Sequence, residues 1–219
     1  MAHRPPSVRR AMLAFLACVL ATASMAGCTN VLFTAAYLLK GNDVPAECKA
    51  LRDKRVAVVC RPVVELQYRN ARTDQDLADM VAALLKKSVP KIKLIDQRKV
   101  SKWIDENTWE EYVEVGKAVG AEMVVGIDLE RFELYRGQTL FQGRANTTLK
   151  VYDCRSGELV FEKRLPQSVY PPNREVSTLS KQEAEFRREF LRILADQLAR
   201  HFYDHDPYAD FALDSKTIE

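Results

Sequence analysis

Two histidines stand four residues apart near the end of the chain, in the segment HFYDHDPYAD (201–210). On a helix that continued through them, His201 and His205 would face the same side, with Asp204 beside them. Two imidazoles and a carboxylate are ligands that zinc or another divalent ion accepts. One interpretation is therefore a metal-binding protein or metalloenzyme that uses these three residues. The alternative is that the histidines interact with the last carbonyls and the dipole of a helix end, which needs no metal.

Other patterns that could support catalysis are weak. Gly116-Lys117 lacks the spaced glycine of a P-loop, and the sequence contains no Gly-x-Ser-x-Gly elbow. Cys60 has no histidine close in sequence to activate it. These patterns favour a non-catalytic protein with no catalytic residues and no cofactor beyond the metal considered above.

Two tryptophans could anchor a protein partner. Trp103 and Trp109 flank the acidic pair Asp105-Glu106. Exposed tryptophans are frequent anchors of protein interfaces, whereas most large aromatic residues contribute to a core. The sequence leaves both interpretations open.

The first residues resemble a targeting segment. Arg4, Arg9 and Arg10 precede an apolar run over residues 11–26, and residues 1–27 contain no acid. As a helix of about 1.5 Å per residue, the run would reach about 24 Å, short of a hydrocarbon core of about 30 Å. The pattern therefore favours a signal peptide. The open alternatives are ordinary secretory cleavage and a single membrane span that continues through residues 31–39.

Met25-Ala26-Gly27-Cys28 resembles the lipobox of bacterial lipoproteins, in which the cysteine is acylated and becomes the first mature residue. The resemblance implies that Cys28 is lipidated and that the protein is anchored in the cell envelope. Several acyl chains together give a stable anchor where one does not. An aspartate directly after the lipidated cysteine would resemble an inner-membrane retention signal, and this chain has Thr29 there instead. We therefore expect the protein to be anchored in the outer membrane, with its domain facing the periplasm.

The charge of the remaining chain argues against nucleic-acid binding. The sequence has 33 basic and 30 acidic residues, and three of the basic ones lie in the leader. Without residues 1–27 the count is 30 against 30, so no basic excess remains to bind phosphates. A content of 47% hydrophobic and 29% charged residues is typical of a globular domain.

The order of expected elements indicates an α/β (α+β) domain. The β-branched run at residues 55–63 predicts a strand buried on both faces, and residues 157–166 end an antiparallel meander. We expect a mixed sheet of about five strands, helices mainly on one face and a long amphipathic C-terminal helix. Expected strands cover residues 55–63, 91–96, 121–136, 137–153 and 157–166. Expected helix signals are Thr73, Asp96, the capping boxes Thr108/Glu111 and Ser180/Glu183, and a C-cap at Gly120.

The cysteines outside the leader and the lipobox are Cys48, Cys60 and Cys154. Three is an odd number, so a disulfide framework is not implied. Cys60 and Cys154 lie in apolar, strand-like runs, which predicts small core residues.

This order of elements resembles the domain shared by the lipoprotein CsgG, the penicillin-binding-protein activator LpoB and the N-terminal part of TolB. The resemblance implies a cell-envelope protein that acts as a binding, scaffolding or regulatory module through an unidentified partner protein. No extra pair of membrane-inserting hairpins is present, so the resemblance does not imply a secretion pore. The matching segments are RVAVV (55–59), KLIDQRKV (93–100), VGAEMVVGIDLE (119–130) and VYDCRSGELVFEK (151–163).

The expected organisation has four parts. Residues 1–27 form the signal peptide, and residues 28–54 form a lipid-anchored apolar segment and a linker. Residues 55–203 form the α/β domain, and residues 204–219 form a polar tail.

Overall fold

The computed structural model describes residues 43–62 and 72–207. The chain divides into two units, Met1–Val44 and Pro45–Glu219, and the folded domain belongs to the second. Residues 45–54, which we expected to be a linker, therefore pack as part of the domain. Among the described residues, no helix has the length and apolar character needed to cross a bilayer.

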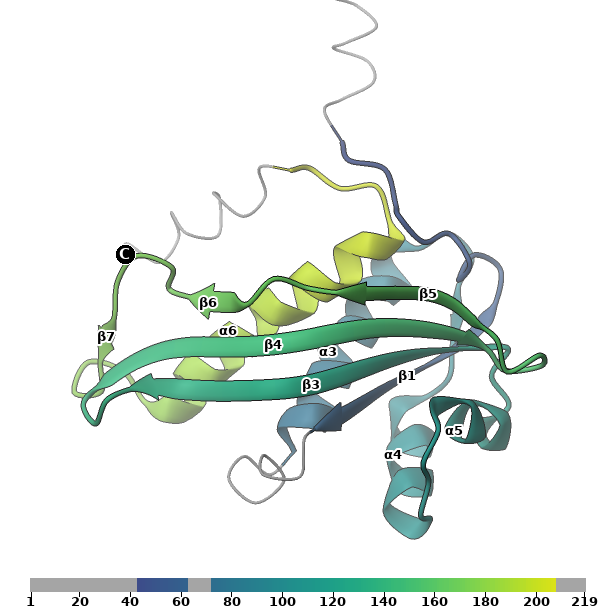
Figure 1. The fold of residues 1–219 in the computed structure, drawn as a ribbon, viewed down its shortest axis with the longest axis horizontal. Coiled ribbons are helices and arrows are strands. Elements are labelled where there is room, and N and C mark those ends of the chain that lie inside the picture. The colour runs from purple at the N-terminus through teal and green to yellow at the C-terminus, as the bar shows by residue number, and fades with distance from the viewer. Residues whose placement is uncertain (1–42, 63–71, 208–219) are drawn as a thin grey trace, which may run out of the picture. The chain divides into compact units, whose positions relative to one another are not determined.

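One mixed sheet organises the domain (Figure 1). Its order is β2-β1-β3-β4-β5, and β6 and β7 pair with the remaining part of β4. β1 runs parallel to β2 and β3, whereas β3, β4 and β5 are antiparallel neighbours. The predicted fold class is confirmed. The strands are β1 (Arg55–Pro62), β2 (Lys93–Leu94), β3 (Met123–Arg136), β4 (Leu140–Asp153), β5 (Leu159–Arg164), β6 (Ser168–Tyr170) and β7 (Val176–Ser177).

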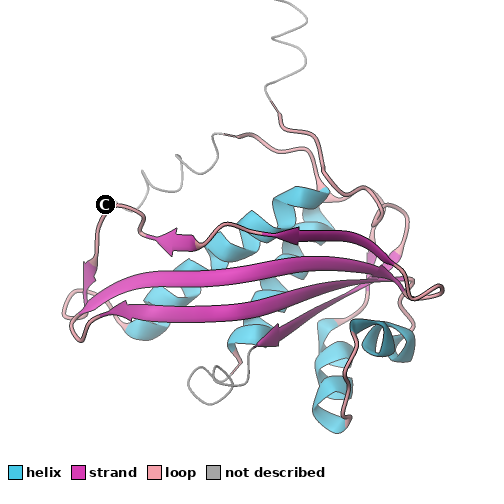
Figure 2. Cartoon of the chain, in the orientation of Figure 1, coloured by secondary structure: helices cyan, strands magenta, loops and turns pink. Residues whose placement is uncertain are grey.

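Helices cover the two faces of the sheet unequally (Figure 2). The long helices α3 and α6 pack on one face, where Val58 and Val125 are buried. The shorter α4 and α5 cover Ala57 and Val124 on the other face. Burial on both faces is the reason that β1 reads as an unbroken β-branched run. The helices are α3 (Thr73–Ser88), α4 (Gln97–Glu106), α5 (Tyr112–Val119) and α6 (Glu183–Ala199), which is followed by the 3₁₀ turn η1 (Arg200–Phe202).

The β3–β4 hairpin extends beyond the strand that it flanks. In the described part of the chain, β1 pairs with β3 as far as Leu129, and the last seven residues of β3 lie beside β4. Stacked aromatic rings hold this extension against α6, with 5.4 Å between the centroids of Phe132 and Phe190 and 4.9 Å between those of Phe141 and Phe186. The hairpin tip is therefore rigidly attached to the start of α6.

The predicted helix ends are partly confirmed. Asp96 caps α4 by accepting the Arg98 N–H at 3.0 Å, and Gly120 ends α5 with a φ of 79°. The two capping boxes are wrong. The N-cap residues of α5 and α6 are Glu111 and Gln182, and neither side chain caps its helix.

Competing contacts explain the failure of the second capping box. The Ser180 hydroxyl donates instead to the Ser177 carbonyl at 2.8 Å. The Glu183 carboxylate accepts from Tyr135 and Arg187. Neither side chain is therefore available to accept from the free backbone N–H groups at the start of α6.

The cysteines of the domain are small buried residues, as predicted for Cys60 and Cys154. These two and Cys48 are free thiols with exposed fractions of 7% or less. Burial raises the pKa of the Cys60 thiol well above its usual value, so this group stays neutral.

A methyl group at residue 143 tests the packing of β4 on α6. A Cβ at Gly143 would lie 2.5 Å from the Phe190 ring, so Gly143→Ala should lower the free energy of unfolding by about 1–3 kcal/mol. Chemical denaturation measures this change. Glu158→Ala, at an exposed turn residue, should stay within about 0.5 kcal/mol of the native value. Equal effects of the two substitutions would contradict this packing.

Candidate functional site

The residues of the predicted metal site lie on an irregular segment. Helix α6 ends at Ala199 and η1 ends at Phe202, so the helix does not continue through His201 and His205. The Asp204 Oδ1 atom accepts the Ala46 N–H at 2.8 Å, and His205 Nδ1 lies 3.2 Å from the Tyr203 carbonyl oxygen. Across the described residues, no three His, Cys, Asp or Glu side chains form a group that could hold a metal ion. Metal binding stays a prediction, which metal analysis of the purified protein tests.

These residues instead hold the start of the domain. The Cys48 N–H donates to the His201 carbonyl at 3.0 Å, next to the Ala46–Asp204 bond. Glu47 lies 3.1 Å from His201 Nδ1 and accepts from Lys163 of β5 at 2.6 Å. We call residues 46–48 with these contacts the clasp. The clasp fixes the point where the chain enters the domain, beside the end of α6.

The folded domain lowers the pKa of Glu47 and that of His201. The hydrogen bond from Lys163 is the main cause that lowers the pKa of Glu47. Burial lowers the pKa of His201, whose side chain is 11% exposed, although Glu47 opposes this effect. The folded domain therefore favours an ionised Glu47 and a neutral His201.

The predicted partner anchors Trp103 and Trp109 are half-buried, and they pack against the core on the side of the sheet that α4 and α5 cover. The Arg61 guanidinium lies 4.5 Å from the centroid of Trp109 and 4.7 Å from that of Tyr112. The Tyr112 hydroxyl donates to Asp128 at 2.7 Å. These contacts give Trp109 a packing role, and partner binding by either tryptophan stays a prediction.

Apolar side chains reach solvent at the tip of the β3–β4 hairpin. Leu179 is 97% exposed and Tyr135 is 42% exposed. They border an open cavity of about 580 Å³, together with Glu183 and Glu185 of α6. We call Tyr135, Leu179 and the turn of residues 177–182 the tip surface.

Hydrogen bonds hold the turn that presents Leu179. The Thr178 N–H donates to the Thr139 carbonyl at 3.0 Å, and the Ser180 N–H donates to the Ser177 carbonyl at 3.0 Å. The Leu179 N–H donates to the Ser177 hydroxyl at 3.2 Å. Leu179 is therefore presented by an ordered backbone. Sequence reasoning missed this residue, and the available signal was a single leucine among polar residues before a helix.

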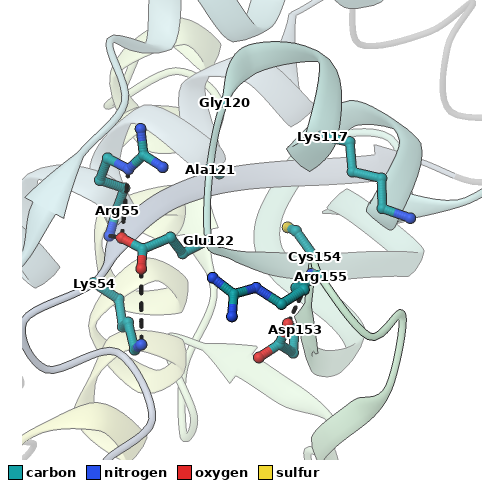
Figure 3. Close-up of a pocket in the computed structure, with 9 residues that line it drawn as sticks. All are labelled: Lys54, Arg55, Lys117, Gly120, Ala121, Glu122, Asp153, Cys154 and Arg155. Carbon is teal, nitrogen blue, oxygen red and sulfur yellow. Dashed lines mark hydrogen bonds and ion pairs between the residues drawn. The ribbon is translucent and has the colours of Figure 1, made fainter.

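A second, polar pocket of about 340 Å³ lies where β1 and β3 begin and β4 ends (Figure 3). Glu122 lies between Lys54 and Arg55, at 3.7 Å and 3.4 Å from their side-chain nitrogens. Arg155 reaches across the pocket in this view, and Lys117 of α5 stands at its rim. We call this the base pocket.

Cys28, the predicted lipidation site, lies outside the described residues. The lipobox therefore remains the basis for that prediction.

Comparison with known proteins gives no sequence relative: no family model matches the chain, and no curated protein matches it. Solved structures give distant likenesses. The PelC dodecamer from Paraburkholderia phytofirmans is 13% identical, with 73% of this chain and 96% of that chain covered and a TM-score of 0.41. The lipoprotein GNA1162 from Neisseria meningitidis is 9% identical, with coverages of 67% and 96% and a TM-score of 0.40. The C-terminal domain of LpoB from Salmonella enterica is 10% identical, with coverages of 61% and 90% and a TM-score of 0.35.

Likeness at this level assigns no function. LpoB is one of these structures, and a likeness at a TM-score of 0.35 does not establish the predicted resemblance. The CsgG and TolB parts of the resemblance stay predictions.

Acidification should weaken the domain through His201. Because burial lowers the pKa of this histidine, the unfolded chain binds its proton more readily than the folded chain does. The stability that depends on neutral His201 is present above about pH 6.5 and is lost as the pH falls toward the lower folded pKa. The lowered pKa of Glu47 acts with the same sign below about pH 4.5.

We therefore expect the free energy of unfolding to fall between about pH 7.5 and pH 5.5, and to fall less in His201→Gln. Denaturant titrations at each pH measure this difference. His205→Gln removes the other histidine of the domain and leaves the clasp intact, so it is the matched control. If the free energy of unfolding of His201→Gln falls with pH as steeply as that of the native protein, His201 does not cause the loss of stability.

Proposed function

We propose that this chain is a bacterial envelope lipoprotein that binds a partner protein and does not catalyse a reaction. Its lipid anchor is Cys28, in the outer membrane, and the domain faces the periplasm. The observation that carries the proposal is Leu179, a large aliphatic side chain that is 97% exposed on an ordered turn. An apolar residue held in this way is suited to insert into a pocket of another protein.

The positions of the clasp and the tip surface support this division of roles. Tyr135 donates to Glu183 at the start of α6, whereas the clasp bonds His201 just beyond its end. A helix of 17 residues is about 25 Å long. The chain therefore enters the domain at one end of α6 and offers its exposed leucine at the other.

Charge favours a protein over a lipid surface as the occupant of the tip surface. Glu183 and Glu185 line the cavity, and the one lysine there, Lys181, is bonded to Glu189 at 2.6 Å. Anionic leaflets attract unpaired basic residues, which this surface does not offer. A protein with an apolar pocket and a polar rim fits better.

Truncation of Leu179 should weaken the partner complex. A photo-reactive amino acid at residue 179 identifies the partner in cells by mass spectrometry, and residue 159 serves as the comparison position. With the purified partner, Leu179→Ala should raise Kd about tenfold, which corresponds to about 1.4 kcal/mol. Leu159→Ala, at a side chain that is 41% exposed on β5, should change Kd less than about twofold. Equal effects, or photo-adducts with lipid alone, would rule out the tip surface as a protein contact.

The anchor is tested separately at Cys28. We expect Cys28→Ser to abolish incorporation of labelled fatty acid and to leave the leader uncleaved, because the acylated thiol is the processing site implied by the lipobox. Cys48→Ser is the matched control, since this buried cysteine lies in the folded domain. A Cys28→Ser protein that keeps its label and its processing would contradict lipidation at this residue.

A further inference from the structure

The base pocket carries more positive charge than its own acids neutralise. Its charged lining consists of Lys54, Arg55, Lys117 and Arg155 against Glu122 and Asp153. Four cations against two carboxylates leave an excess of two positive charges in a space of about 340 Å³. This volume suits a small ligand or the charged head of a larger one.

Both acids are already engaged. Glu122 accepts the Arg55 backbone N–H at 3.1 Å and pairs with the side chains of Arg55 and Lys54. Asp153 accepts the backbone N–H groups of Arg155 at 2.7 Å and Ser156 at 3.2 Å. These backbone hydrogen bonds lower the pKa of Asp153 and that of Glu122. Both carboxylates are therefore ionised and already hydrogen-bonded.

The other two cations are Arg155 and Lys117. Within the described part of the chain, the side chains of Arg155 and Lys117 make no hydrogen bond or ion pair. Lys117 complements the dipole at the end of α5, which accounts for its charge there. Arg155 does not lie at a helix end, and its charge is one of the smaller causes that lower the pKa of Asp153. Figure 3 shows its guanidinium reaching across the pocket.

The backbone that carries Arg155 is fixed in advance. Besides the two bonds to the Asp153 carboxylate, the Gly157 N–H donates to the Asp153 carbonyl at 2.8 Å, and Gly157 adopts a φ of 79°. The Glu158 N–H donates to the Ser156 hydroxyl at 3.2 Å. A ligand bound by Arg155 therefore orders only a side chain, and not the turn beneath it.

The remaining wall is uncharged. Cys154 lines the pocket, and burial raises the pKa of its thiol to about 11. The thiol is therefore a neutral surface, and it adds no negative charge that would repel an anion.

We propose that the base pocket binds a phosphate group, with Arg155 as the principal ligand and Lys117 closing the rim. The planar guanidinium matches the oxygens of phosphate, and the excess of two positive charges matches a phosphate monoester of about −1.5 to −2. Free phosphate compounds and the headgroup of an anionic lipid share this chemistry. The site is independent of the tip surface.

Titration of the full chain with inorganic phosphate at low ionic strength, followed by amide NMR shifts, tests the proposal. We expect saturable shifts confined to residues 120–122 and 153–156, and a Kd at least tenfold higher in Arg155→Ala/Lys117→Ala. Lys87→Ala/Arg98→Ala removes one lysine and one arginine from exposed helix positions, so it is matched in charge and should keep the native Kd. An unchanged thermal midpoint in both double variants shows that each is folded.

Vesicles separate the two sources of the phosphate group. Stronger co-sedimentation with phosphatidic acid vesicles than with phosphatidylcholine vesicles, to which the acyl anchor binds equally, would assign a lipid headgroup if the difference is lost in Arg155→Ala/Lys117→Ala. Saturable binding of inorganic phosphate without such sedimentation would assign a soluble phosphate compound. Equal weakening by the two double variants, or shifts that chloride at the same ionic strength reproduces, would overturn the site.

Discussion

The clasp is the constraint on which the functional arrangement depends. It joins residues 46–48 to the end of α6 and to β5, across sequence separations of more than one hundred residues. If these residues were free, the point of entry into the domain would be undefined. With the clasp formed, the chain enters at one end of α6, and the start of the same helix holds the tip surface.

Magnitudes indicate which contacts hold the clasp. The Glu47 side chain is 41% exposed, so its ion pair with Lys163 contributes at most about 1 kcal/mol. The backbone hydrogen bonds of Ala46 and Cys48 contribute about 1 kcal/mol each. Leu51, which lies a few residues after the clasp and is fully buried, contributes about 2 kcal/mol. Burial and backbone bonds therefore hold the segment, and the ion pair mainly orients it.

The unequal lengths of the strands create the tip surface. Within the described residues β1 covers eight positions, whereas β3 and β4 have fourteen each and extend beyond their pairing with it. Burial of Phe132 and Phe141 under α6 stabilises this extension. The same packing places Tyr135 at the start of α6 and leaves the turn before α6, with Leu179, in solvent.

Local patterns predicted most of the fold. The β-branched run of β1, the glycine after α5 and the cap at Asp96 are short-range signals, and the structure confirms them. The box at Ser180 failed because a nearby turn and a distant tyrosine compete for its side chains. Capping propensity alone does not predict which of several hydrogen-bond partners such a side chain takes.

The sites were harder to predict than the fold. The histidine spacing places both side chains on one face only on a continuing helix, and α6 ends at Ala199. The bond between Glu47 and Lys163 joins residues 116 positions apart. The base pocket combines residues from the start of β1, from α5, from the loop before β3 and from the end of β4 with its turn. No sequence window contains these groups together. Nor does the sequence show that Leu179 is the most exposed large hydrophobic residue in the described part of the chain.

The central claim is that the clasp and the tip surface are fixed at opposite ends of one rigid body. Pulsed electron paramagnetic resonance between spin labels at the exposed residues Lys49 and Leu179 measures this directly. We expect a narrow distribution of distances between the two labels, with a mean of about 25 Å or more that the length of α6 sets. A broad distribution, or a mean well below that length, would contradict it.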